Sequence, residues 1–280
     1  MSYELKETIL YLDNVELGYG EGSEYKTVLK DISLIEKDVV RVGHEATGQI
    51  IAVVGRSGRG KSTLFKALTG LVKPKSGEIL ISALDEVDKN AAKVVSEGDV
   101  GFVDQKYTLF RHKTVEQIFH YALRKSGLSN DDKKLKIDKY CGEWGLESHR
   151  TQYPCELSGG QRQRTAIIEQ ILSSGRFMIL DEPFSGLDVG NIRDVKRSFD
   201  LIQKDHELNT IIYSTHELRL AVELADSIYV VGYPTIDGVK QNYATIVKHY
   251  DLKAMGIAWT EFGQEHTKLI TDIDATMMAS

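Results

Sequence analysis

Eight consecutive residues have the types and spacing of a loop that binds phosphate groups. They read Gly55-Arg56-Ser57-Gly58-Arg59-Gly60-Lys61-Ser62 and match the pattern G-x-x-x-x-G-K-[ST]. Glycines let the backbone curl so that successive N–H groups face one anion, and a following helix adds its positive N-terminal end. An apolar run over 50–54 precedes the loop and good helix formers over 64–68 follow it, which disfavours a merely solvated turn. We predict that Lys61 reaches the β- and γ-phosphates of a nucleotide and that Ser62 binds Mg²⁺.

Two carboxylates follow a second apolar run. Residues 177–180 are apolar, and Asp181 and Glu182 come directly after them. Ligands of open parallel sheets bind at the carboxyl ends of the strands, where these two acids are expected to lie. We predict that Asp181 holds Mg²⁺ through water and that Glu182 polarises an attacking water. Strands that end in acids are common, so this prediction depends on the phosphate loop being present as well.

The elements that must position these residues form an alternating series. Segments with helical spacing separate short apolar runs, which predicts an α/β protein with a mostly parallel sheet. The strands up to about residue 40 are expected to form an antiparallel layer, and 108–161 a helical subdomain beside the sheet. The predicted strands are 9–15, 28–35, 50–54, 100–103, 177–180, 210–213 and 228–231, and the predicted helices are 61–69, 115–124, 133–144, 161–172, 192–203 and 218–224.

Composition excludes some classes of protein. The chain has 280 residues and a formal net charge of −6, which gives no electrostatic argument for a nucleic-acid partner. Cys141 and Cys155 lack the spacing of a zinc site or a redox pair, so they are expected to be reduced thiols in a cytosolic compartment. No apolar run approaches about 18 residues, so the chain is expected to be soluble and not to span a membrane by itself.

A further motif narrows the field to one family. Residues 157–164, Leu-Ser-Gly-Gly-Gln-Arg-Gln-Arg, resemble the signature of ATP-binding cassette (ABC) ATPases. By themselves they would fit an ordinary helix cap followed by a basic, solvated face. Other motifs of the family follow in the expected order from Tyr19 to His216, and the resemblance covers roughly residues 9–232. Tyr19 resembles the aromatic that stacks on adenine, Gln105 the glutamine loop, residues 185–188 the loop that communicates across a dimer, and His216 the switch histidine. An exposed loop tyrosine and a structural histidine are the alternatives for Tyr19 and His216.

The resemblance implies the ABC ATPase fold, with ATP and Mg²⁺ as ligands and two cassettes paired head to tail. Implied catalytic residues are Glu182, His216, Lys61 and Gln105, and implied metal-site residues are Ser62, Gln105 and Asp181. Implied nucleotide-binding residues are Tyr19, Gly55, Ser57, Gly58, Gly60, Lys61, Ser62, Thr63, Ser158, Gly159, Gly160, Gln161 and Asp188. In such a dimer Ser158 and Gly160 of one cassette would act on the γ-phosphate held by the other.

The function implied is that of an ATP-hydrolysing subunit of an ABC transporter. Leu109-Phe110 and the segment 114–116 resemble bacterial importer ATPases, with nitrate, sulfonate or taurine importers as a plausible subgroup. The expected partners are a second cassette, a membrane permease that docks near Gln105 to Phe110, and a substrate-binding protein; no nucleic acid is expected. The chain would then lie on the cytoplasmic face of the membrane. The alternatives are a soluble ABC ATPase that acts on DNA or ribosomes and, less favoured because Glu182 and His216 are present, a nucleotide sensor without turnover.

Three segments depart from the family pattern. Residues 37–47 form a long, charged approach to the third strand, which is interpreted as a surface insertion. Ile168-Glu169-Gln170 replaces the small and basic residues expected after the signature. Residues 233–280 fit no known regulatory domain, so the ABC domain is predicted to cover 1–232 and the remainder to be an extension.

Overall fold

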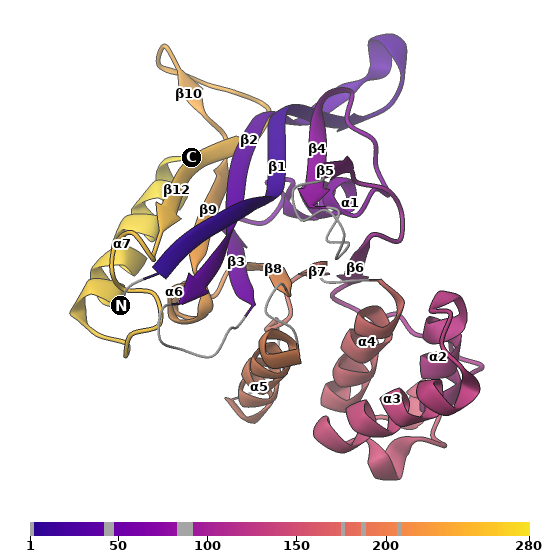
Figure 1. Cartoon of the computed structure of the whole chain (residues 1–280). Helices are drawn as coiled ribbons and strands as arrows, with labels where there is room; N and C mark the ends of the chain where they lie inside the picture. The colour runs from indigo at the N-terminus through magenta and orange to yellow at the C-terminus, as the bar shows by residue number, and fades with distance from the viewer. Residues whose placement is uncertain (1–2, 42–47, 83–91, 175–176, 186–188, 206–208) are drawn as a thin grey trace.

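A six-stranded sheet forms the centre of the molecule. The computed structural model describes residues 3–41, 48–82, 92–174, 177–185, 189–205 and 209–280. The strand order is β12-β9-β3-β8-β7-β6; neighbouring strands are parallel except β12, which is antiparallel to β9. This arrangement confirms the predicted α/β class (Figure 1). The strands are β3 (Gln49–Val54), β6 (Val100–Val103), β7 (Phe177–Leu180), β8 (Thr210–Thr215), β9 (Ser227–Gly232) and β12 (Thr245–Asp251).

An antiparallel sheet covers one side of the central sheet, as predicted. Its order is β2-β1-β4-β5, and its strands are β1 (Tyr3–Tyr19), β2 (Lys26–Arg41), β4 (Ser76–Ser82) and β5 (Ala92–Val94). Arg41 pairs with Tyr3, so residues 37–41 continue β2. Residues 37–41 are therefore paired strand residues, whereas the interpretation of 37–47 as a surface insertion stays a prediction; residues 42–47 lie outside the described residues.

Alternation along β3 separates two apolar cores. Side chains of successive strand residues point to opposite faces of a sheet. Ile50 and Ala52 belong to the core formed with α5 (Val189–Asp205), α6 (Leu218–Leu224), α7 (Gln264–Ala279) and the helical lobe. Ile51 and Val53 belong to the core formed with α1 (Lys61–Leu68) and the antiparallel sheet. Both faces of the central sheet are thus covered, as parallel strands require.

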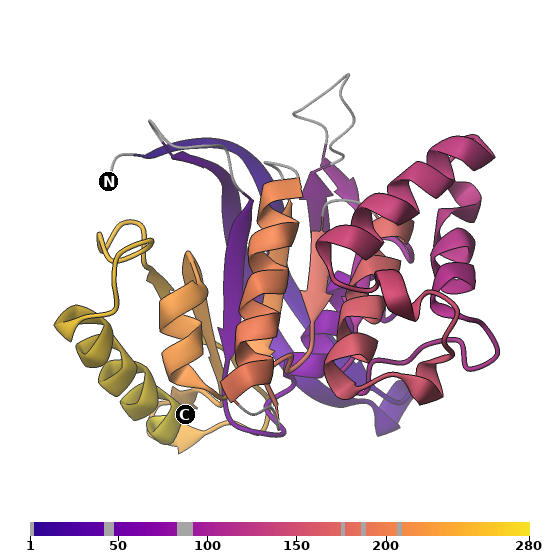
Figure 2. The ribbon, with the colours of Figure 1, turned by 90° about the horizontal axis from the view of Figure 1, so that it is seen from below.

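A helical lobe projects beside the sheet, where a helical subdomain was predicted. It contains α2 (Val115–Ala122), α3 (Asn130–Glu143) and the start of α4 (Gly159–Ser173). Figure 2 shows this lobe and α7 on opposite sides of the molecule, with α5 and α6 between them. The unusual residues after the signature have structural roles in α4. Ile168 is fully buried, and the Gln170 side-chain oxygen accepts a hydrogen bond of 3.1 Å from the Phe102 N–H of β6.

The segment after residue 232 is structured and shares the main core. It forms the hairpin β10 (Thr235–Ile236) and β11 (Val239–Lys240), then β12 and α7. Leu269, Ile273 and Met277 of α7 are buried in the core that also contains α6. Strand β12 belongs to the same sheet, and α7 to the same core, as residues before 232. The domain boundary at 232 stays a prediction. Among the helices of the described residues, none has the length and apolar character needed to cross a membrane.

Candidate nucleotide site

The phosphate loop connects β3 to α1 and depends on left-handed glycines. Gly58 and Gly60 have φ angles of 77° and 86°, which side chains other than glycine rarely tolerate. Gly60 is the residue that caps α1, and a Cβ atom there would lie 3.0 Å from Leu29 and Val28. Lys61 is nearly buried and donates a 2.7 Å hydrogen bond from Nζ to the Gly55 carbonyl. The predicted strand, loop and helix are confirmed, with the lysine folded over the loop.

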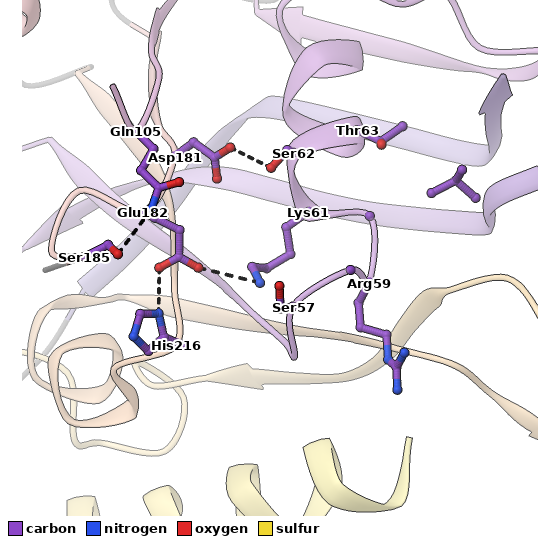
Figure 3. Close-up of a pocket in the computed structure, with 13 residues that line it drawn as sticks. Ser57, Arg59, Lys61, Ser62, Thr63, Gln105, Asp181, Glu182, Ser185 and His216 are labelled. Carbon is purple, nitrogen blue, oxygen red and sulfur yellow. Dashed lines mark hydrogen bonds and ion pairs between the residues drawn. The ribbon is translucent and has the colours of Figure 1, made fainter. Parts of the chain in front are cut away.

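A cavity of about 560 Å³ lies in front of this loop. Figure 3 shows the phosphate loop on one side and the acidic end of β7 on the other. The tertiary structure therefore brings together most of the residues predicted for the site in one chain. The lining residues are Val28, Ser57, Gly58, Arg59, Gly60, Lys61, Ser62, Thr63, Gln105, Asp181, Glu182, Ser185 and His216.

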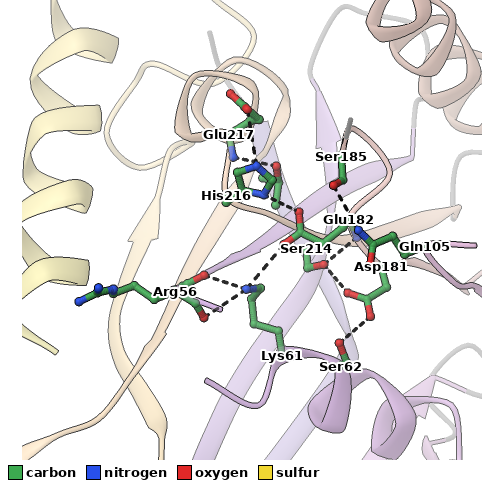
Figure 4. A network of polar contacts seen from close by, with 12 residues as sticks. Arg56, Lys61, Ser62, Gln105, Asp181, Glu182, Ser185, Ser214, His216 and Glu217 are labelled. Atoms are coloured by element: carbon green, nitrogen blue, oxygen red, sulfur yellow. Dashed lines mark hydrogen bonds and ion pairs between the residues drawn. The ribbon is translucent and has the colours of Figure 1, made fainter. Parts of the chain in front are cut away.

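Ser62 and Asp181 are in direct contact. The Ser62 hydroxyl donates a 2.6 Å hydrogen bond to Asp181 Oδ2, and the Ser214 hydroxyl donates one of 2.6 Å to Asp181 Oδ1 (Figure 4). The Ser214 oxygen also accepts a 2.9 Å hydrogen bond from the Glu182 N–H. Ser214 is fully buried at the end of β8, and the sequence analysis assigned it no role. The available signal was a hydroxyl residue that ends a strand of otherwise apolar character beside β7.

Glu182 makes contacts with two opposed groups. Its Oε2 atom lies 2.9 Å from His216 Nδ1, and its Oε1 atom lies 3.7 Å from Lys61 Nζ. The carboxylate is largely buried, whereas the histidine is 56% exposed. Glu182 has a φ angle of 51°, which is unfavourable for a residue with a side chain. This backbone turn directs the carboxylate away from the strand and into the cavity.

Of two further predicted residues, Gln105 lines the cavity, whereas Tyr19 only contacts one of its lining residues. Gln105 donates a 3.2 Å hydrogen bond from Nε2 to the Ser185 hydroxyl, which links the predicted glutamine loop to the segment before residue 186. Tyr19 is about half exposed, and its hydroxyl lies 3.1 Å from the Thr63 hydroxyl at the start of α1. Its ring is therefore exposed beside the phosphate loop, where the predicted stacking on adenine would require it. The predicted contact residue Asp188 lies outside the described residues.

The signature residues do not line this cavity. Ser158 caps α4: its hydroxyl accepts from the Gln161 N–H, and the Gln161 side chain accepts from the Ser158 N–H at 2.7 Å. The helix cap considered in the sequence analysis is therefore present. Gly159 and Gly160 are the first residues of the same helix. Ser158, Gly159, Gly160 and Gln161 thus present a helix N-terminus, a favourable place for an anion, outside the cavity of their own chain.

The oxygen atoms of Ser62 and Asp181 fit a magnesium ion. Mg²⁺ prefers oxygen ligands and commonly binds through one or two carboxylates together with substrate phosphates. Among the described residues there is no cluster of three or more acidic, histidine or cysteine side chains that would hold a metal without such phosphates.

A phosphate loop that faces two carboxylates at the carboxyl edge of a parallel sheet defines a phosphate-loop nucleotide-binding protein. Residues 44–185 match the family model described as ABC transporter, and the chain belongs to this family as its ATP-binding domain. The resemblance carried by the signature motif is thereby confirmed. The alternative of a soluble ABC ATPase that acts on DNA or ribosomes is not favoured by the relatives described next.

The similar curated proteins are import ATP-binding proteins. The chain is 33% identical over 230 residues to the sulfate/thiosulfate import ATP-binding protein CysA of Synechocystis, which covers 82% of this chain and 60% of that protein. It is 30% identical over 233 residues to the methionine import ATP-binding protein MetN of Streptococcus pneumoniae, covering 81% of this chain and 63% of that one. The chain therefore spans somewhat less than two thirds of the length of these relatives.

Solved structures share the fold. The structure of cbiO1 from Clostridium perfringens, described as part of the ABC transporter complex cbiONQ, aligns with a TM-score of 0.67 and 25% identity over 90% of this chain and 92% of that one. A dimeric ATP-binding cassette in a post-hydrolysis state, bound to ADP and Pi, aligns with a TM-score of 0.64 and 23% identity over 87% and 99%. The predicted ABC ATPase fold is confirmed.

Proposed function

We propose that this chain is the ATP-hydrolysing subunit of an ABC importer. The observation that carries the proposal is the convergence of Lys61, Asp181, Glu182 and His216 on one cavity. Lys61 would neutralise the β- and γ-phosphates. Magnesium would add charge neutralisation when bound, held by Ser62 and Asp181 with Gln105 nearby. The remaining chemistry consists of holding the attacking water and accepting its proton.

Glu182 is the residue proposed to orient that water. Its carboxylate faces the cavity and His216 holds it from the opposite side at 2.9 Å. The histidine would therefore act by fixing the carboxylate's direction. General base catalysis contributes roughly 10²- to 10⁴-fold to a rate, so its loss is measurable.

A second cassette is proposed to complete the site. Residues 158–161 present N–H groups and a hydroxyl at the start of α4, outside the cavity of their own chain. Such a helix N-terminus suits the γ-phosphate of a nucleotide held by another chain. Hydrolysis would then accompany a cycle of association and release of two cassettes, in which Asp188 also contributes across the interface.

Steady-state ATP turnover of Glu182→Gln tests this function. We expect turnover to fall at least about 100-fold while a dimer accumulates with bound ATP. Glu217→Gln is a matched control, because Glu217 is 55% exposed and lies beside His216 without lining the cavity. Parental turnover in Glu182→Gln would show that the assignment is wrong.

The membrane partner is proposed to dock near Gln105 to Phe110. Phe110 and Tyr121 are both more than a third exposed, and their rings meet edge to face with centroids 5.0 Å apart. The guanidinium of Arg124 covers the Tyr121 ring at 4.1 Å. Aromatic and arginine side chains of this kind are common anchors of protein interfaces. The chain would then be peripheral on the cytoplasmic face of the membrane, with a permease and a substrate-binding protein as its transport partners.

Copurification tests the docking surface. The parental chain, expressed with its chromosomal neighbours, is expected to bring a multispan membrane protein from detergent-solubilised membranes. Phe110→Ser should reduce that yield several-fold, whereas Leu135→Ser, at an exposed position on α3, should not. Equal yields from both variants would exclude this surface. The transported compound stays open: the relatives import sulfate, thiosulfate or methionine, and the nitrate, sulfonate or taurine subgroup stays a prediction.

A further inference from the structure

Arg59 occupies the phosphate loop, yet its side chain leaves the loop away from Lys61 (Figure 3). Its guanidinium lies over the Tyr233 ring, 4.0 Å from the centroid. Its NH2 atom donates a 3.5 Å hydrogen bond to the main-chain oxygen of Ser280, the residue that follows α7. The Arg59 Nε atom is buried and has no hydrogen-bond partner in the part of the chain that the structure describes. Arg59 therefore joins the phosphate loop to a residue that is 221 positions away in sequence.

Ser280 packs directly against Gly232, where any larger residue would overlap with it. A Cβ atom on Gly232, the last residue of β9, would lie 2.2 Å from Ser280 Oγ and 2.4 Å from Ser280 Cβ. The preceding residue, Val231, packs in the same way against the first residue of the phosphate loop. Its carbonyl oxygen would lie 2.4 Å from a Cβ atom on Gly55. The start of the phosphate loop and the end of α7 thus press against adjacent residues of one strand.

The C-terminal helix is anchored well enough to hold Arg59. Leu269 and Met277 of α7 are at most 8% exposed, and Ile273 is fully buried. A phosphate loop has few side-chain contacts of its own, since its glycines contribute none. The Arg59 side chain, which contacts Tyr233 and Ser280, therefore restricts the loop at its own position.

We propose that Arg59 is a positioning residue that couples the phosphate loop to Ser280, which packs against Gly232 at the end of β9. Through this contact α7 raises the affinity of the loop for ATP. Fixing Arg59 keeps the neighbouring backbone N–H groups directed at the anion. The coupling is reciprocal: if the packed position of Ser280 favours ATP binding, then bound ATP must favour that packed position by the same factor. The proposal requires only that ATP binds at this loop, not that the chain serves a transporter.

A double-mutant cycle with a non-hydrolysable ATP analogue tests the coupling. Arg59→Ala removes the side chain, and Gly232→Ala displaces Ser280 without touching Arg59. Each is expected to weaken binding about 5- to 20-fold, within the usual range of coupling between sites. The double variant is expected to bind within about twofold of either single variant, because both changes break one linkage. In turnover assays KM should rise with kcat changed less than about twofold.

Controls separate this role from simple loss of charge or of folding. Lys268→Ala removes one positive charge from the exposed face of α7, where Lys268 pairs with Glu265, and should leave affinity unchanged. Tyr233→Leu removes the ring beneath the guanidinium and should reproduce Arg59→Ala, which keeps the test intact should Gly232→Ala not fold. Hydrogen exchange of the last turn of α7 should slow on adding the analogue in the parent and not in Arg59→Ala.

Several results would overturn the proposal. Multiplicative effects in the double variant would show that Arg59 and Ser280 act separately. A loss of affinity in Arg59→Ala with none in Gly232→Ala and Tyr233→Leu would mean that Arg59 contacts the nucleotide itself. If the ATP analogue left hydrogen exchange in the last turn of α7 unchanged in the parent, the reciprocal effect of ATP on α7 would be excluded. Failure of the parent to bind the analogue would reject the nucleotide site altogether, whereas normal binding without coupling rejects only this inference.

Discussion

Lys61 Nζ lies 3.7 Å from Glu182 Oε1, so the proposed phosphate-binding lysine is paired with the carboxylate proposed to act on water. Both side chains are at most 17% exposed, which makes the pairing stronger than one at the surface. A nucleotide would compete with Glu182 for the lysine and would meet repulsion from the carboxylate. Binding of ATP must therefore redirect both groups.

Neutralising Glu182 should tighten ATP binding while it removes turnover. In Glu182→Gln the lysine loses its competing anion and the phosphates lose a repelling charge, so we expect the Kd for ATP to fall about tenfold. Equilibrium titration without hydrolysis measures this value. Glu217→Gln should bind as the parent does. An unchanged or higher Kd in Glu182→Gln would show that the ion pair does not oppose the nucleotide.

Ser214 should prove essential for the geometry of the acidic pair. Ser214→Ala leaves Asp181 Oδ1 and the Glu182 N–H without these partners, in a fully buried place. We expect a loss of about 1–3 kcal/mol in the free energy of unfolding, together with reduced turnover. Urea denaturation and ATPase assays measure the two effects. The hydroxyl of Ser173 is exposed, so Ser173→Ala should change neither quantity.

Tyr19 should contribute through its ring. Stacking of an aromatic pair is worth about 1 kcal/mol, so Tyr19→Ala should raise the KM for ATP about fivefold. Tyr19→Phe keeps the ring and loses only the contact with Thr63, and should stay within about twofold of the parent. Inhibition by tripolyphosphate, which has no base, should be equal in all three proteins. If Tyr19→Phe is as weak as Tyr19→Ala, the hydroxyl and not the ring matters.

The free energy of unfolding should fall as pH rises, because the buried carboxyl of Glu169 then loses its proton. Burial raises the pKa of this carboxyl from 4.5 to about 7, which Arg124 offsets only in part. The folded chain therefore binds the proton more tightly than the unfolded chain, and the stabilisation present below pH 4.5 is lost as pH rises through about 7. Glu169→Gln should gain about 1–3 kcal/mol at pH 8 relative to the parent and little at pH 5.

Urea midpoints at the two pH values measure this difference. Burial likewise raises the pKa of Asp226, to about 6, so the parent will keep part of its pH dependence in the variant. The control is Glu265→Gln, on the exposed face of α7, which should follow the parental profile. An equal gain at pH 5 and pH 8 would show that packing and not ionisation is responsible.

The sequence by itself determined the family, the phosphate loop and most of the central strands. The strands predicted at 100–103 and 177–180 match β6 and β7, and the helix predicted at 218–224 matches α6. These elements are defined by local signals, namely continuous apolar runs and helical spacing. The motif residues were equally readable because a phosphate-binding backbone needs glycine, lysine and serine at fixed local distances.

Only the tertiary structure decided which distant residues support that site. Ser214 contacts Asp181 and Glu182 because β7 and β8 are neighbours in the sheet, and a hydroxyl at the end of an apolar strand does not by itself say which strand lies beside it. The helix α7 was not predicted, since its apolar face is weak and becomes a core element only once α6 and β9 are beside it. The link from Arg59 to Ser280 is of the same kind. Apolar periodicity shows which face of an element is buried, but not which distant residues meet that face, because this depends on how the elements pack together.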